Sequence, residues 1–119
     1  MKILIVDDND DNIVLEKTIL KSCGYTIATA ADGVHALEVA SQFCPDMIIS
    51  DILMPRMDGF ELCRTVKANE QLKKVPFIIY SASFTGSEDK TLAKALGAST
   101  FIEKPIDPEE FVKIIKKLV

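Results

Sequence analysis

The sequence has no tryptophan, a single histidine, three cysteines and no long apolar run. No apolar stretch approaches the ~18 residues that a membrane-spanning helix needs, and the opening MKILIVDD turns acidic before a signal-peptide core could form. Cys23, Cys44 and Cys63 are odd in number and lack the spacing of a zinc site, so we expect them to be reduced and in the core or at its boundary. These absences predict a cytoplasmic protein without a membrane segment or a disulfide framework.

An excess of basic residues is also missing. The formal net charge is -4 at pH 7, whereas nucleic-acid binding depends on a clustered positive surface, so we expect no direct contact with nucleic acid. The 119 residues, 48% of them hydrophobic and 27% charged, are typical of one globular domain, which we expect to span residues 1–119.

The sequence does contain a regular alternation of short apolar runs with longer segments of helical period. The runs are ILIV (3–6), YTIATA (25–30), MIIS (47–50), FIIYSA (77–82) and TFIE (100–103). Continuous apolar runs are typical of parallel strands that are covered on both faces, and the segments between them are long enough for crossover helices. We therefore predict an α/β fold, a (βα)5 domain with a doubly wound five-stranded parallel sheet.

The helix at the carboxyl end is the best specified. Asp107 is placed to cap it, Pro108 occupies its first position, and Glu110 stands where the acid of a capping box belongs. Its apolar stripe is Phe111, Ile114, Ile115 and Leu118. Weaker signals mark the earlier helices, with Asp32 as the cap of the second. The apolar positions assigned to the first helix are Ile13, Leu15, Ile19, Leu20 and Cys23.

Charged and hydroxyl side chains follow four of the five predicted strands. They are Asp7 and Asp8 after the first strand, Asp51 after the third, Ser81 at the end of the fourth and Lys104 after the fifth. In an open parallel sheet this edge holds the ligand site. Two like charges 4 Å apart repel by about 4 kcal/mol at an effective dielectric of 20, so three carboxylates need a cation, and Mg²⁺ suits them. The alternative is that each acid only caps a helix or a loop.

The segments IVDD, SDILMPRMDG, YSAS and EKP occur in this order and at these spacings, and with them the chain resembles the receiver domains of two-component response regulators over essentially its whole length. The resemblance implies a flavodoxin-like receiver fold with strand order 2-1-3-4-5. It also implies a regulatory phosphoacceptor rather than an enzyme, one that promotes only its own phosphorylation and dephosphorylation.

By this resemblance Asp51 is the phosphoacceptor. It would take a phosphoryl group from a histidine kinase or a histidine phosphotransfer protein. Asp8, Asp51 and the main-chain carbonyl of Leu53 would bind Mg²⁺ directly, and Asp7 would act through a bound water.

The resemblance also assigns a switch. Lys104 would contact Asp51 and the phosphoryl oxygens, and its bond to Pro105 is expected to be cis. Ser81 would donate a hydrogen bond to the phosphoryl group, and Phe101 would rotate inward as the loop after the fourth strand moves. An exposed lysine before a turn and a plain core phenylalanine are the alternatives for Lys104 and Phe101.

Two positions depart from the polar residues that many receivers carry. Leu53 stands two residues after Asp51, and Ser83 stands two residues after Ser81. In other receivers the side chains at these two positions help to place the water that hydrolyses the phosphoaspartate. An apolar Leu53 cannot do this, so we hypothesise slow self-dephosphorylation.

Three other functions share parts of this pattern. A haloacid-dehalogenase-like phosphatase needs a DxDx[TV] pattern, which DDNDDN after the first strand does not supply. A flavodoxin-like cofactor binder needs a phosphate loop there, and the aspartates would repel a phosphate. A degenerate receiver that only binds partners is disfavoured by the full set of site residues. The output partner or domain is unknown, and we expect a monomer or a phosphorylation-dependent dimer.

Overall fold

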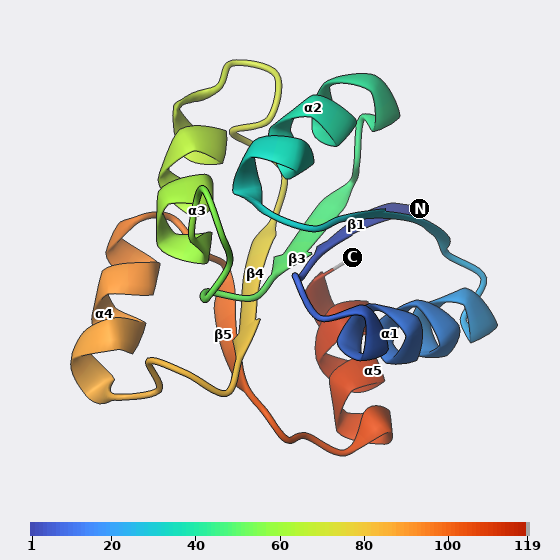
Figure 1. Cartoon of the computed structure of the whole chain (residues 1–119). Helices are drawn as coiled ribbons and strands as arrows, with labels where there is room; N and C mark the ends of the chain where they lie inside the picture. The colour runs from blue at the N-terminus through green and yellow to red at the C-terminus, as the bar shows by residue number, and fades with distance from the viewer. Residues whose placement is uncertain (119) are drawn as a thin grey trace.

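The computed structural model describes residues 1–118, and its centre is a sheet of five parallel strands (Figure 1). The strands are β1 (Lys2–Val6), β2 (Thr26–Ala30), β3 (Met47–Ser50), β4 (Phe77–Ser81) and β5 (Thr100–Glu103). Their order in the sheet is β2-β1-β3-β4-β5. The predicted fold class and strand order are confirmed, because each apolar run forms a strand whose ends lie within one residue of the predicted ends.

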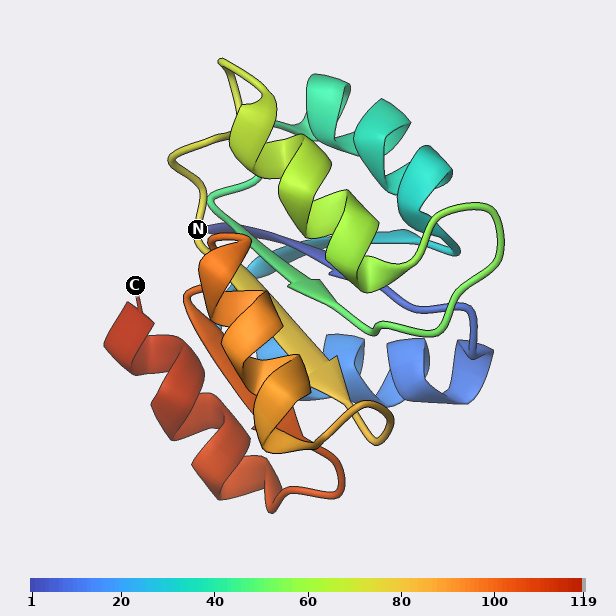
Figure 2. The ribbon, with the colours of Figure 1, turned by 90° about the vertical axis from the view of Figure 1, so that its left-hand side faces the viewer.

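Five helices cover the two faces of the sheet. They are α1 (Asp10–Ser22), α2 (Gly33–Phe43), α3 (Gly59–Ala68), α4 (Ser87–Ala95) and α5 (Pro108–Leu118). Figure 1 and Figure 2 show α1 and α5 on one side of the sheet and α2, α3 and α4 on the other. Within the described residues, no helix is both long and apolar enough to cross a membrane.

The sheet has two hydrophobic cores, one on each face, and each inner strand contributes side chains to both. Ile5 and Ile49 pack with α1 and α5, whereas Val6 and Ile48 pack with α2 and α3. Successive side chains of a strand point to opposite faces, so a strand with helices on both sides must be apolar throughout. Full burial of one such side chain stabilises the fold by about 1.5–3 kcal/mol.

Side-chain caps begin α1, α2 and α3. The carboxylate of Asp32 accepts a hydrogen bond from the backbone N–H of His35 at 2.9 Å, which confirms the predicted cap of α2. Asn9 and Asp58 cap α1 and α3 in the same way. These bonds satisfy backbone donors that have no partner inside the helix.

The start of α5 confirms Asp107 as the predicted cap and Pro108 as the first helical residue, but not the capping-box role of Glu110. The side chain of Asp107 accepts from the backbone N–H of Glu109 at 2.8 Å, and the carboxylate of Glu110 lies 3.7 Å from Nζ of Lys113. The predicted capping box is therefore absent, because Glu110 pairs along the exposed face of the helix with a lysine three residues away.

Two apolar assignments were wrong. Leu15 is 59% exposed, while Glu16 beside it is buried, so the inward face of α1 runs through Ile13, Glu16 and Leu20. Cys44 is exposed rather than at the boundary of the core, because it ends α2 in the left-handed conformation with φ 52°.

Candidate functional site

The candidate site lies at the carboxyl ends of β1 and β3, where the strand order reverses. Val6 pairs with Ser50 in the sheet, so Asp7 and Asp51 leave the sheet side by side. The backbone N–H of Asp51 donates to the carbonyl of Val6 at 2.9 Å, and that of Asp7 donates to the carbonyl of Ala30 at 3.1 Å. This is the position at which open parallel sheets bind ligands.

The ammonium of Lys104 joins the two acids. Its Nζ lies 3.1 Å from Oδ2 of Asp7 and 3.3 Å from Oδ2 of Asp51. Burial alone lowers the pKa of Lys104, but the negative charges of Asp51 and Asp7 outweigh burial and hold the pKa above its usual value. Lys104 is therefore a fixed charge that bridges β1, β3 and the end of β5.

The two carboxylates differ in their surroundings. Asp7 is 2% exposed, and its Oδ1 accepts from the backbone N–H of Asn9 while its Oδ2 also accepts from the amide of Asn12. Among residues 1–118, Oδ1 of Asp51 accepts one hydrogen bond, from the neighbouring N–H of Ile52, and the Asp51 side chain keeps 16% of its surface exposed. Asp51 is thus the carboxylate that an incoming reagent can reach.

The predicted acidic trio is gathered only in part. Asp8 is exposed, because neighbouring residues at the end of an extended strand point in opposite directions. Within residues 1–118, no three His, Cys, Asp or Glu side chains are already arranged around one metal position. Nevertheless, the carboxylates of Asp7 and Asp51 both contact the Lys104 ammonium. We call these two carboxylates the rim. Oxygen ligands of this kind fit a hard cation such as Mg²⁺.

The fourth and fifth strands place the other predicted residues. Ser81 is fully buried, and its hydroxyl accepts a hydrogen bond from the backbone N–H of Ser83 at 3.0 Å. Its carbonyl accepts from the backbone N–H of Lys104 at 2.9 Å, and the Lys104–Pro105 peptide is cis as the resemblance implies. Phe101 is half-buried and lines a cavity of about 340 Å³ with residues of α4.

The loop from Asp51 to α3 is pinned closely to the sheet. A side chain at Gly59 would place its Cβ 2.2 Å from the carbonyl oxygen of Asp51, so only glycine permits this approach. Arg56, with φ 66°, donates two hydrogen bonds to the carboxylate of Asp32, at 2.9 and 3.0 Å. The N–H of His35 and then Arg56 hold the pKa of Asp32 below its usual value. Sequence reasoning missed this ion pair, whose partners stand 24 residues apart with no pattern linking them.

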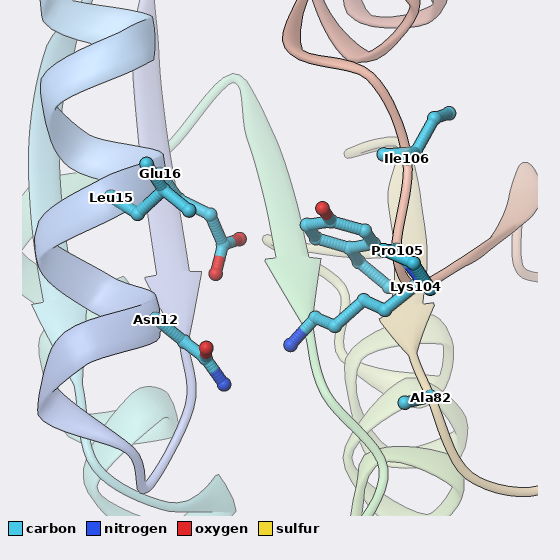
Figure 3. Close-up of a pocket in the computed structure, with 8 residues that line it drawn as sticks. Asn12, Leu15, Glu16, Ala82, Lys104, Pro105 and Ile106 are labelled. Atoms are coloured by element: carbon cyan, nitrogen blue, oxygen red, sulfur yellow. The ribbon is translucent and has the colours of Figure 1, made fainter.

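A pocket of about 330 Å³ opens between α1 and the segment after β5 (Figure 3). Its lining includes Glu16, Lys104 and Tyr80. Burial is the main reason that the pKa of Glu16 rises to about 8; Lys104 lowers it, and Asp7 and Asp51 raise it further. Sequence reasoning missed Glu16, although the signal was present: it stands three residues after Ile13 and four before Leu20, on the inward stripe of α1.

Comparison with known proteins agrees with this geometry. The family model described as "Response regulator receiver domain" matches residues 3–116. The response regulator PleD of Caulobacter vibrioides is 39% identical over 106 residues, which are 89% of this chain but 23% of PleD, so the chain spans less than a quarter of that relative.

Solved structures share this likeness over 98–99% of the chain. The chemotaxis response regulator CheY4 of Vibrio cholerae superposes with a TM-score of 0.92 at 36% identity, covering 99% of this chain and 98% of CheY4. The receiver domain of the sensor histidine kinase PA1611 of Pseudomonas aeruginosa, described with a magnesium ion coordinated in its active site cleft, superposes with a TM-score of 0.87 at 29% identity, covering 98% of this chain and 94% of that domain.

Proposed function

The chain belongs to the response regulator receiver domain family, and from that premise we propose that it is switched by a phosphoryl group accepted on Asp51. The observation that carries this proposal is the Lys104 ammonium held between Asp7 and Asp51 at the reversal of strand order. A capping role for these acids would not need a buried lysine from the far end of the chain.

Asp51 is suited to accept the group. An oxygen of its carboxylate would form a bond to phosphorus while the bond from phosphorus to the donor histidine nitrogen breaks, and that nitrogen keeps the electron pair. The backbone hydrogen bond from Asp51 to the carbonyl of Val6 and the hydrogen bond from the N–H of Ile52 hold the Asp51 carboxylate in place, so little conformational freedom is lost on reaction.

Mg²⁺ is the metal proposed for the site. Asp8, Asp51 and the carbonyl of Leu53 would hold it, with Asp7 acting through a water. When bound, Mg²⁺ supplies positive charge that offsets the charge on the transferring phosphoryl group. The exposed carboxylate of Asp8 is free to turn toward the rim, whereas Asp7 is fixed by Asn9 and Asn12.

Lys104 would bind the phosphoryl oxygens as a point charge, since an ammonium on a flexible stem can follow an anion. The proposed switch runs through Ser81 at the end of β4 and Phe101 in β5. The Ser81 hydroxyl would donate its hydrogen to a phosphoryl oxygen on Asp51, while a lone pair of the same hydroxyl still accepts from the N–H of Ser83; a shift of the hydroxyl toward the phosphoryl group would therefore pull the loop that carries Ser83. Movement of that loop frees space beside Phe101, whose cavity adjoins α4.

The donor proposed for Asp51 is a histidine kinase or a histidine phosphotransfer protein. The phosphorylated domain would control a partner or an output domain, as a monomer or a phosphorylation-dependent dimer. Because PleD is much longer than this chain, its complete activity is not transferred to this chain.

The test is phosphorylation with acetyl phosphate and Mg²⁺, followed by intact mass, in parallel with an NMR titration of beryllofluoride. The wild-type protein should gain one phosphoryl group, and amide shifts should spread from Asp51 to Ser81 and Phe101. Asp51→Asn should abolish both effects. A matched control is Asp46→Asn, at the opposite end of β3, where the amide oxygen can still accept from the N–H of Lys2. Equal phosphorylation of Asp51→Asn and the wild type would refute the assignment.

A further inference from the structure

The pocket beside the acidic rim contains a buried acid that the proposed phosphoryl transfer does not use. Glu16 is 5% exposed, and Figure 3 shows its carboxylate reaching from α1 into the pocket toward the side of Lys104. An isolated carboxylate is costly to bury, because it gives up its hydration. A glutamate at this position on the inward face of α1 therefore calls for an explanation beyond packing.

Glu16 and Lys104 are already coupled by charge. The approach of the ammonium lowers the pKa of the Glu16 carboxyl, while the acids of the rim raise it. In turn, Glu16 is one of the charges that raise the pKa of Lys104, after the larger effects of Asp51 and Asp7. The two side chains line the same pocket, so no barrier of packed residues separates them.

The resting contacts of Lys104 are made to two carboxylates that belong to the proposed metal site. Nζ binds Oδ2 of Asp7 and Oδ2 of Asp51. A divalent cation bound here would draw on the same carboxylates and repel a neighbouring ammonium, so Lys104 would have to loosen those contacts. A displaced ammonium in a partly buried pocket needs another acceptor to avoid a large desolvation cost.

Tyr80 provides a surface along which that movement can occur. Nζ of Lys104 lies 4.8 Å from the centre of the Tyr80 ring, and Tyr80 lines the same pocket as Glu16. The ring of Tyr80 is itself fixed, because it stacks on Phe111 at 4.9 Å between centroids. The cation can therefore leave the rim without losing its aromatic contact.

We propose that Glu16 is a positioning residue that receives the Lys104 ammonium when a divalent cation binds beside Asp7 and Asp51. This inference rests on the proposed function, because it requires the rim to bind Mg²⁺. Glu16 touches no phosphoryl group; it acts by keeping the displaced ammonium in the pocket, close enough to return to the phosphoryl oxygens. In the competing view, Glu16 is a buried neutral acid with no part in metal binding.

The experiment is a double-mutant cycle of Mg²⁺ affinity at pH 8, measured by amide NMR titration. Glu16→Gln should raise the Mg²⁺ dissociation constant about fivefold in the presence of Lys104, because a charge-assisted hydrogen bond to the ammonium is lost. In the Lys104→Met background the same substitution should change the constant less than about twofold. Glu38→Gln, at an exposed position on α2, is the matched control and should leave the affinity unchanged.

A second readout follows the lysine directly. The ¹³Cε signal of Lys104 should shift on adding Mg²⁺ to the wild-type protein, and the shift should be much smaller in Glu16→Gln. The inference would be overturned if Glu16→Gln weakened Mg²⁺ binding equally with and without Lys104, or did not weaken it at all. It would also be overturned if the Mg²⁺-dependent shift of the Lys104 signal were the same in Glu16→Gln and the wild type. Each of these results would leave the proposed function intact. Absence of Mg²⁺ binding by the wild-type protein would overturn both.

Discussion

Replacing Glu16 with glutamine should stabilise the protein, and increasingly so as the pH rises. Burial is the main reason that the pKa of this carboxyl moves from 4.5 to about 8 in the folded state. Below pH 4.5 the group is protonated in both the folded and the unfolded chain, so it contributes nothing to the pH dependence. Between pH 4.5 and 8 the unfolded chain loses the proton and the folded chain retains it, so folding becomes less favourable as the pH rises.

The magnitude follows from the same difference. At about 1.4 kcal/mol for each pKa unit, the cost of Glu16 above pH 8 has a ceiling of about 5 kcal/mol. Because the pocket is open to water at one side, we expect about 3 kcal/mol. Glutamine has the same shape and no charge, so it removes this cost. For a domain of this size the change corresponds to a rise in Tm of about 10 °C.

The assay is a set of thermal and urea unfolding curves between pH 5 and pH 9, recorded in EDTA so that metal binding does not contribute. The difference in free energy of unfolding between Glu16→Gln and the wild type should be small at pH 5, grow through pH 7 and level off above pH 8. Glu38→Gln, on the exposed side of α2, should show no such growth. A gap that does not change with pH, or a wild-type protein that is the more stable at pH 9, would refute the reasoning.

Three other substitutions test the rim and its loop. Lys104→Met should lower the free energy of unfolding at pH 7 by about 3 kcal/mol, because it leaves the buried carboxylate of Asp7 and the partly buried one of Asp51 without a counter-charge, and should abolish beryllofluoride shifts beyond Asp51; unchanged urea midpoints would contradict this. Leu53→Asn should shorten the lifetime of the phosphorylated protein, since an amide can orient the hydrolytic water; an equal or longer lifetime in a phosphate-release assay would refute it. Gly59→Ala should destabilise the fold by more than about 2 kcal/mol and weaken beryllofluoride binding, because its Cβ would meet the carbonyl of Asp51, whereas Gly86→Ala, whose Cβ would meet only a side-chain oxygen at 3.2 Å, should do neither.

The sheet could be predicted from sequence because each inner strand is buried on both faces. Ile48 and Ile49 point in opposite directions and both reach a core, so the apolar run has no polar gap and its ends can be located closely. The order of the strands in the sheet is harder to derive, because the alternation of strands and helices along the chain does not say which strand lies beside which. Here the order 2-1-3-4-5 came from the family resemblance, and the structure confirms it.

The site could be predicted only in part. The reversal of strand order explains why residues following β1 and β3 meet, and Asp7 and Asp51 do meet through Lys104. The direction of a side chain after a strand is set by one-residue alternation and by the next turn, and this is why Asp8 faces solvent while Asp7 does not. The pair of Arg56 and Asp32 depends on how a loop folds over a helix end, for which the sequence offers no period.

Glu16 shows why charge is an unreliable guide to exposure. A glutamate usually lies on the surface and a leucine in the core, so residue type alone favours Leu15 over Glu16 as the inward side chain. The helical period places position 16, not 15, on the line from Ile13 to Leu20, and the period prevails because those two flanking side chains pack in the core. The chain thereby buries an acid beside the lysine that the rim already uses. Lys104 therefore interacts by charge both with Asp7 and Asp51 and with Glu16. A substitution of Glu16 on α1 should consequently change metal binding at the end of β3, although α1 does not carry the phosphoacceptor.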